Sequence, residues 1–283
     1  MTVPHPTGST TYVDRVTLAV TDLDAVLAFY REVVGLAVLD RTSDRAVLGT
    51  DDRSLLVLEA DPDADERPPR AAGLFHTAFL FPSRAALGDA LHRIQASGDQ
   101  LTGASDHRVS EALYLRDPEG NGVELYRDRP REEWPETDGR VEMDTLPLDT
   151  DALLADRAGA ADASAPSETA VGHVHLEVTD LDDSEAFYVD GVGFDVRQRW
   201  ADEALFVAAD GYHHHVGLNT WNRRSDPVSG RGLVEISVVV PDEDAVDAAR
   251  DRLAGIGARV DEDSDDSFLV SDPDGIRIRI RAD

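Results

Sequence analysis

Short stretches of alternating apolar and polar residues recur along the chain, and each predicts a β-strand. Residues 16–20 and 174–178 alternate with a period of two, as a half-buried strand does. Each is followed by the letters TDLD, which can cap a helix, and then by a helical stretch that includes Ala-Phe-Tyr. After the first of these helices, short strands are expected at 46–48 and 55–58. An order of strand, helix and further strands therefore begins at two places in the chain.

The same order begins at two further places. One starts at Leu74 with LFHTAFLF, continues through an amphipathic helix at Arg84–Ser97, and ends in strands at 112–115 and 122–126 joined by the turn DPEG. The other starts at Leu233 with LVEISVVV and runs through a helix at 243–254 to a strand at 276–281. The pattern predicts an α+β protein made of four βαβββ modules.

An internal repeat groups these modules into two halves. VDRVTLAVTDLDAVLAFYREVVGL from Val13 and VGHVHLEVTDLDDSEAFYVDGVGF from Val171 align without a gap. RDPEGNGVEL from Arg116 and SDPDGIRIRI from Ser271 form a second matching pair. We therefore expect modules one and two in residues 1–130 and modules three and four in residues 170–283. The stretch between, at 131–169, is rich in Pro, Ala, Asp and Glu and is expected to be a linker with one short helix.

Charge and composition exclude several classes of function. The chain has 57 acidic and 27 basic residues, and all the basic ones are arginine. This balance argues against nucleic acid and against anionic membranes as partners, and it resembles the surfaces of proteins from salt-loving microbes. The absence of cysteine excludes disulfides and thiolate metal sites. The N-terminal residues do not resemble a signal peptide, and no apolar run approaches ~20 residues, so we expect a cytoplasmic protein.

The positions of the nine histidines suggest a metal site. His76 lies in the first predicted strand of module two, and His173 and His175 share one face of the first strand of module three. Glu124 lies in the last strand of module two. Two neutral imidazoles and one carboxylate from facing modules can hold a divalent iron on one face and leave the opposite positions open. His5 and His92 have no such context, and we expect no functional role for them.

These motifs together resemble a known family. The TDLD…AFY openings and the HTAF…DPEGNGVELY closing are similar to those of the vicinal oxygen chelate superfamily, which includes glyoxalases, bleomycin-resistance proteins and extradiol dioxygenases. SDHRVSEALYLRDPEGNGVELYRDRPR and GYHHHVGLNTW resemble its bacterial catechol-2,3-dioxygenase group. The resemblance runs from about Tyr12 to Arg281. It implies that the modules form two paired-module, open-barrel domains.

The resemblance also implies a ligand set. Matched by position, the family's metal ligands are His76, Glu124 and His173. Modules two and three must then face one another around one metal, either within one chain or across a dimer, and modules one and four would pair without a metal. In module four, Glu235 and Arg279 stand at the histidine and glutamate positions. The more familiar extradiol layout has its site in modules three and four, so this chain departs from it.

Further roles follow from the same matching. Tyr114 and His107 would be catalytic residues that contact the substrate. One histidine of GYHHHVGLNTW, expected in the last strand of module three, would handle protons. The family pattern favours His214 for this role, with His215 next. Strand alternation puts His213 and His215 on the face opposite to His214, and which face points inward is left open. The expected substrate-binding residues are His215, His175 and Trp221. Trp200, Phe206, Trp221 and Phe79 could line an aromatic pocket, although core packing is the favoured interpretation of each.

The activity implied is extradiol cleavage of a catechol by O2 at a mononuclear Fe(II) site, with Mn(II) as an alternative metal. The product would be a ring opened beside, not between, the two hydroxyl-bearing carbons. One alternative is a glyoxalase-type metal-dependent isomerase or lyase. That chemistry normally uses a second glutamate ligand, and the matching position holds Gly217. Another alternative is a non-catalytic protein that sequesters a drug or small aromatic molecule. The small aromatic diol is the expected partner, and a homo-oligomer is left open.

Overall fold

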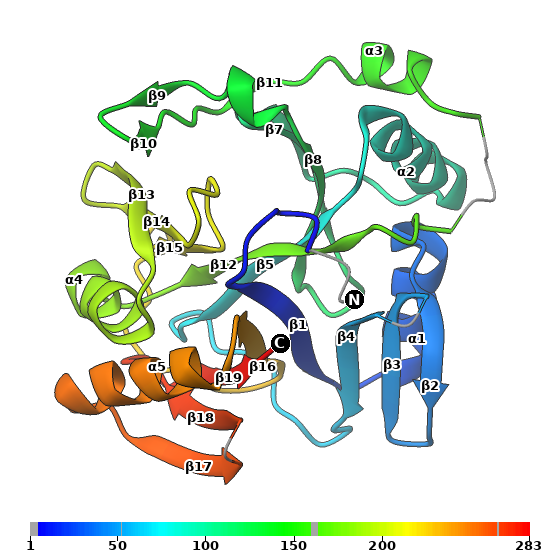
Figure 1. Cartoon of the computed structure of the whole chain (residues 1–283). Coiled ribbons are helices and arrows are strands. Elements are labelled where there is room, and N and C mark those ends of the chain that lie inside the picture. Colours follow the sequence, from blue (N-terminus) through cyan, green and yellow to red (C-terminus); the bar gives the residue numbers. More distant parts are fainter. Residues whose placement is uncertain (1–4, 52, 160–163, 265) are drawn as a thin grey trace.

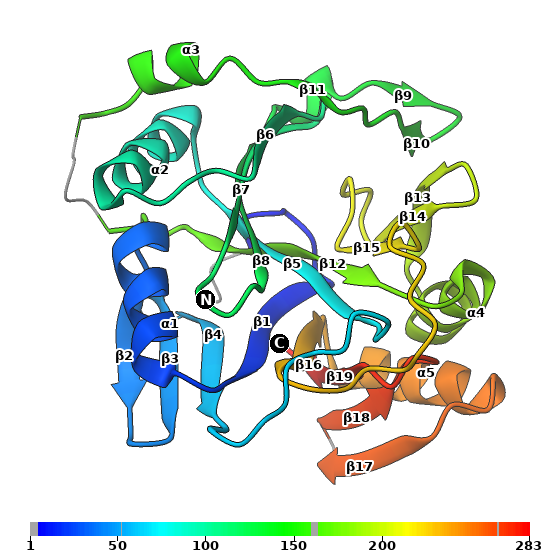
Figure 2. The same ribbon diagram turned by 180° about the vertical axis from the view of Figure 1, so that it is seen from behind.

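The computed structural model describes residues 5–51, 53–159, 164–264 and 266–283. It contains an eight-stranded sheet and a nine-stranded sheet, together with a short two-stranded hairpin. Figure 1 shows four strand-and-helix units arranged around β1, β5 and β12 in the middle of the molecule, and Figure 2 shows the same arrangement from behind. Buried apolar residues of both large sheets belong to one continuous core.

The four predicted βαβββ modules are confirmed, and their elements are as follows. Module one consists of β1 (Tyr12–Val20), α1 (Leu23–Phe29), a π-helical turn (Tyr30–Val34), β2 (Ala37–Arg41), β3 (Arg45–Thr50) and β4 (Arg53–Ala60). Module two consists of β5 (Gly73–Leu80), α2 (Arg84–Ser97), β6 (Gly103–Asp106), β7 (Ser110–Arg116) and β8 (Gly122–Asp128). Module three consists of β12 (Ala170–Glu177), α4 (Leu181–Glu185), a π-helical turn (Ala186–Val192), β13 (Asp195–Trp200), β14 (Ala204–Ala208) and β15 (Val216–Asn219). Module four consists of β16 (Gly232–Val240), α5 (Glu243–Gly255), β17 (Val260–Ser264), β18 (Ser267–Ser271) and β19 (Arg277–Ala282).

The TDLD segments cap the first helices of modules one and three, as expected. The side chain of Asp22 accepts a hydrogen bond from the backbone N–H of Ala25, and that of Asp180 accepts from Asp182 and Asp183. These bonds satisfy amide groups that have no partner within the helix. Each helix therefore begins directly after its first strand and folds back onto the sheet.

The pairing of modules does not follow their order in the chain. β1 pairs antiparallel with β16, so that modules one and four share the eight-stranded sheet. β12 pairs antiparallel with β5, so that modules two and three share the nine-stranded sheet. Both pairings form within one chain. The boundaries 1–130 and 170–283 therefore group the modules by sequence only, and each sheet takes strands from both sides of the linker.

The linker is more ordered than its composition suggested. It contains the expected short helix, α3 (Thr150–Ala155), and also a 3₁₀ turn (Arg131–Glu133), a hairpin of β9 (Glu136–Thr137) and β10 (Arg140–Val141), and β11 (Leu146–Pro147). β11 pairs with β6 and forms one edge of the nine-stranded sheet. Trp134 and Val141 are buried against Tyr212, so a few apolar residues attach this acidic segment to module three.

Among the described residues, no helix is both long and apolar enough to cross a membrane. The cytoplasmic location stays a prediction from the sequence.

Candidate metal centre and its cavity

Three neighbouring strands in the middle of the nine-stranded sheet carry the predicted ligands. Ala78 of β5 is paired with Glu124 of β8 on one side and with His173 of β12 on the other. His76 lies two residues before Ala78 and therefore on the same face of β5. Because Ala78 carries only a methyl group, the space above it is open to the three longer side chains. The strand register thus brings side chains that lie far apart in the sequence to one point.

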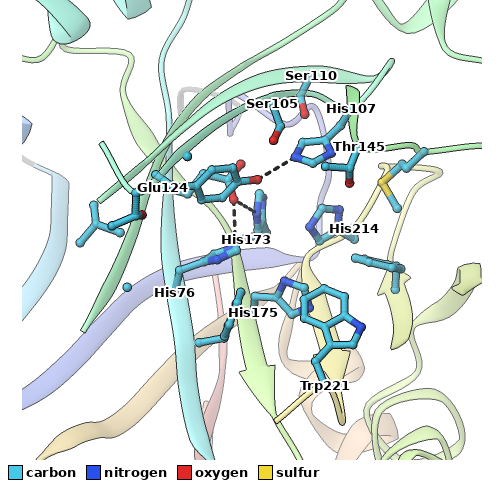
Figure 3. A pocket seen from close by; sticks show the side chains of 18 of the residues that line it. His76, Ser105, His107, Ser110, Glu124, Thr145, His173, His175, His214 and Trp221 are labelled. Atoms are coloured by element: carbon cyan, nitrogen blue, oxygen red, sulfur yellow. Dashed lines mark hydrogen bonds and ion pairs between the residues drawn. The ribbon is translucent and has the colours of Figure 1, made fainter. Parts of the chain in front are cut away.

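The side chains of His76, Glu124 and His173 point toward one another (Figure 3). Nε2 of His76 is 2.9 Å from Oε2 of Glu124, and Nε2 of His173 is 3.1 Å from the same oxygen. The ligand atoms of all three residues lie within 4.8 Å of one another. All three side chains are buried, with residue exposures between 2% and 5%. Two histidines and a glutamate placed in this way could hold a metal ion.

The protonation states suit metal binding. Burial alone would raise the pKa of Glu124, but the neighbouring His173 and His76 outweigh it and hold that pKa well below its usual range. Burial lowers the pKa of His173 to about 4. At neutral pH the site thus offers an anionic oxygen and a neutral imidazole nitrogen, which are the forms that bind a divalent cation.

The eight-stranded sheet repeats this register without the ligands. Ser237 of β16 takes the place of Ala78. It is paired with Arg15 of β1, at the position of His173, and with Arg279 of β19, at the position of Glu124. Glu235 stands where His76 does, and it forms an ion pair with Arg279 at 2.8 Å. Among the described residues, the group of three metal-binding side chains occurs in modules two and three only.

A cavity of about 610 Å³ opens beside the ligands. Tyr114 lies directly across from Glu124 on β7, and its hydroxyl is 2.7 Å from Nε2 of His107. Nδ1 of His107 is 2.7 Å from the carbonyl oxygen of Asp144 in the linker. Burial, with a smaller contribution from Glu124, raises the pKa of Tyr114 well above its usual range. Both predicted residues thus line the cavity, and the linker holds one of them in place.

The histidine triplet lies in the turn before β15 and not in the strand itself, contrary to the expectation. The backbone there bends instead of alternating, so each ring takes its own direction. His214 lines the cavity, with its ring centroid 4.1 Å from that of His173 (Figure 3). His213 turns toward Asp128, its Nε2 lying 2.9 Å from Oδ1.

His215 is placed away from the cavity, and its assignment to substrate binding is corrected. Its ring stacks on Phe194 and Tyr212, and its Nδ1 accepts a hydrogen bond from the backbone N–H of Ala209. It is fully buried. Phe79 is likewise a core residue, packed against Tyr30.

The other three aromatic residues line the cavity, although core packing was the favoured interpretation of each, and His175 lines it as well. Trp200, Phe206 and Trp221 surround it, and the ring centroids of His175 and Trp221 are 5.2 Å apart. Sequence reasoning missed several further lining residues from module two and the linker, namely Phe75, Ser105, Ser110, Met143, Asp144 and Thr145. The position of Phe75 beside His76 in the first strand of module two could have indicated it. The linker residues carry no such signal.

The paired βαβββ modules around a His-His-Glu cluster define the class of protein. The family model described as the Glyoxalase/Bleomycin resistance protein/Dioxygenase superfamily matches residues 12–125 and 170–280. The chain belongs to this superfamily.

Individual relatives agree with this membership. The chain is 42% identical over 270 residues to the catechol-2,3-dioxygenase of Bacillus subtilis, an alignment that covers 93% of this chain and 94% of the relative. It is 34% identical over 114 residues to biphenyl-2,3-diol 1,2-dioxygenase 3 of Rhodococcus globerulus, covering 39% of this chain and 60% of that one. Among solved structures, glyoxalase I of Zea mays superposes with a TM-score of 0.61 at 16% identity, over 98% of this chain and 94% of that chain, which shows the shared fold.

The position that would distinguish a glyoxalase-type site is occupied by glycine. In module three, His175 of β12 is paired with Gly217 of β15, just as Ala78 is paired with Glu124 in module two. A Cβ atom on Gly217 would lie 2.8 Å from Cδ2 of His175. The ring of His175 therefore covers the place where a second glutamate would begin, and the site has one carboxylate from this pair of strands.

Proposed function

We propose that the chain is an extradiol ring-cleaving dioxygenase that opens a catechol with O2 at a mononuclear metal site. The observation that carries the proposal is the convergence of His76, Glu124 and His173 at the floor of a cavity that also exposes His214 and Tyr114. The similarity to a catechol-2,3-dioxygenase over nearly the whole chain supports it. A small aromatic diol is the proposed partner.

The donor set fits Fe(II), with Mn(II) as an alternative. His76, Glu124 and His173 would hold the ion by two imidazole nitrogens and one carboxylate oxygen, and the side of the cluster that faces the cavity would stay open for substrate and O2. When bound, the metal would hold the diol and O2 side by side and let electron density pass from the ring to oxygen. The remaining chemistry concerns binding and protons, and it falls to the side chains around the cavity.

His214 is the proposed acid–base group. Burial, followed by the influence of His173 and His213, holds the pKa of His214 well below its usual range, so its imidazole is neutral and can accept a proton from a catechol hydroxyl. The same nitrogen would then return the proton when the ring opens. Such transfers by a placed side chain contribute ~10²- to 10⁴-fold to a rate.

Tyr114 and His107 would bind a substrate oxygen on the other side of the cavity. Because the carbonyl of Asp144 can only accept, Nδ1 of His107 carries the proton in that bond, and Nε2 of neutral His107 accepts from the Tyr114 hydroxyl. The phenol oxygen of Tyr114 then has lone pairs available to a substrate hydroxyl. Phe206 and Trp221 would pack against the aromatic ring of the diol.

The test is anaerobic loading with Fe(II), followed by oxygen uptake with catechol in high-salt buffer. We expect stoichiometric iron, oxygen consumption that requires catechol, and a yellow ring-opened product. His214→Ala should keep its iron but turn over ~10²-fold more slowly. No oxygen uptake by a folded, iron-loaded sample across several substituted catechols would refute the proposed reaction.

A further inference from the structure

A chain of hydrogen bonds leads from the end of β8 to the acid–base histidine. Oδ1 of Asp128 is 2.9 Å from Nε2 of His213, and Nδ1 of His213 is 2.8 Å from Nδ1 of His214. Nε2 of His214 has no hydrogen-bond partner among the described residues, and its ring lines the cavity. The series therefore runs from a carboxylate, through one imidazole, to a second imidazole whose far nitrogen is free for substrate.

The carboxylate at one end determines where the protons lie. An ionised Asp128 can only accept, so Nε2 of His213 must donate to it. When His213 carries only this proton, its Nδ1 accepts, and Nδ1 of His214 carries the proton between the two rings. Nε2 of His214 is left as a lone pair directed toward the cavity. This is the tautomer that a general base needs at that position.

The first two members of the series, Asp128 and His213, are held by the residues around them. The hydroxyl of Tyr212 donates to Oδ2 of Asp128 at 2.9 Å and lies 2.7 Å from the hydroxyl of Tyr126. His213 is fully buried, and its ring centroid lies 4.1 Å from Tyr212 and 5.2 Å from Trp134. Fixed side chains of this kind set the orientation and tautomer of a catalytic or ligating histidine in many enzymes.

One strand face supplies both the metal site and this series. Glu124, Tyr126 and Asp128 alternate along β8, so all three point to the same side of the sheet. Tyr126 packs on His173 with a centroid distance of 4.7 Å. The Cβ of any larger residue at Gly172 would lie 1.7 Å from the Tyr126 hydroxyl, so glycine at this position leaves the room that the tyrosine requires.

We propose that Asp128 and His213 are positioning residues that hold His214 as its Nδ1–H tautomer, with Nε2 facing the substrate. In the forward step, the O–H bond of a bound diol breaks and its proton bonds to Nε2 of His214. The resulting imidazolium keeps its Nδ1–H bond to His213, and the charge of Asp128 acts on it through that ring. When the ring opens, the Nε2–H bond breaks and this proton returns to an oxygen of the product. This inference rests on the proposed dioxygenase function.

Nitrogen-15 NMR of histidine-labelled protein tests the tautomer without reference to activity. Zn²⁺, which is diamagnetic, would stand in for iron, and His214→Gln identifies the signals of His214. We expect Nδ1 of His214 and Nε2 of His213 to be the protonated nitrogens. In His213→Phe, we expect His214 to lose this single state and exchange between tautomers. Protonation of His214 at Nε2 in the unsubstituted protein, or an unchanged tautomer in His213→Phe, would overturn the proposal.

Steady-state kinetics provide the second readout. His213→Phe should lower kcat ~10- to 100-fold while KM for catechol and bound iron stay within twofold. His213→Gln keeps a donor and an acceptor and should recover part of this loss, and Asp128→Asn should reduce kcat in the same way as His213→Phe. His5→Phe is the matched control, because His5 is also a buried histidine stacked on a tyrosine, with centroids 3.9 Å apart, and should leave kcat unchanged.

The two readouts separate the failure of this inference from that of the proposed function. If iron-loaded protein without substitutions consumes no O2 with any catechol, the proposed function fails, and the tautomer measurement alone decides the arrangement of protons. If that protein is active and His213→Phe or Asp128→Asn matches its kcat, the positioning role is refuted. Should His213→Phe fail to fold, His213→Gln and Asp128→Asn carry the same comparison.

Discussion

Replacing Gly217 with alanine tests whether the floor of the cavity is built as described. The added Cβ would lie 2.8 Å, 2.9 Å and 3.0 Å from three ring atoms of His175. Ordinary contact begins at about 3.4 Å, so the imidazole would have to shift by roughly half an ångström. Its ring centroid lies 5.1 Å from that of His76, 5.2 Å from Trp221 and 5.4 Å from Phe75, which leaves little room for the shift.

Overpacking of this kind costs ~1–3 kcal/mol in the free energy of unfolding. We therefore expect Gly217→Ala to lower Tm by several degrees and, because His175 lines the cavity beside His76, to raise KM for catechol. The assay is thermal and denaturant unfolding in high-salt buffer, followed by oxygen uptake of the iron-loaded protein. Gly255→Ala is the control, since a Cβ there meets nothing within 4 Å and should be neutral or slightly stabilising.

A double-mutant cycle makes the origin of the cost explicit. In the background His175→Ala the ring is gone, so the further change Gly217→Ala should cost little or nothing. An equal cost in both backgrounds, or a Gly217→Ala variant as stable as Gly255→Ala, would refute the reasoning that the glycine exists to make room for His175.

Three further predictions follow from the ligands, the buried carboxylates and the surface charge. His76→Ala should lose its iron during gel filtration, because the imidazole beside Glu124 is gone. The control His92→Ala, at a helical position outside the buried face of α2, should retain iron. Full retention of iron by His76→Ala would remove His76 from the ligand set. Burial, with a smaller contribution from Asp274, raises the pKa of Asp272 to about 7, so the folded state keeps a proton that the unfolded state releases. Between roughly pH 4 and pH 7 the free energy of unfolding should therefore fall by ~1.4 kcal/mol per pH unit relative to that of Asp272→Asn, and it should then level off. If the free energy of unfolding depended on pH in the same way in both proteins, this prediction would be contradicted. The net charge of the protein is -30, so its acidic residues repel one another in the folded state. The Tm should rise as KCl increases from 0.1 M to about 1 M, because the screening length falls from ~10 Å to ~3 Å. A Tm that stays level would show that this repulsion does not destabilise the folded state.

Local pattern in the sequence predicted the modules, and the family resemblance implied the set of metal ligands. Alternation, TDLD caps and the DPEG turn are short-range features, so the strands and helices could be placed from neighbours in the chain. The family resemblance placed His76 and His173 at corresponding positions of modules two and three, and Gly217 where a second glutamate would be. The chemical nature of the site could therefore be inferred before any distance was known.

The meeting of these residues was decided by tertiary structure, because it depends on which strands pair. Sequence allowed modules two and three to join within a chain or across a dimer, and the antiparallel pairing of β5 with β12 places them within one chain. The same pairing gives a register in which Ala78 separates Glu124 from His173. No local pattern encodes such a register.

The turn before β15 shows the limit of periodicity most clearly. Three identical side chains in a row offer no pattern that distinguishes them, and strand alternation was the wrong basis because the backbone there is not a strand. Their separate roles come from partners that lie far away in sequence: His213 meets Asp128, His214 meets His173, and His215 meets Phe194. The sequence alone determined which groups this protein has for its chemistry. Only the folded chain, through long-range packing, decided which of them face one another and which are turned away.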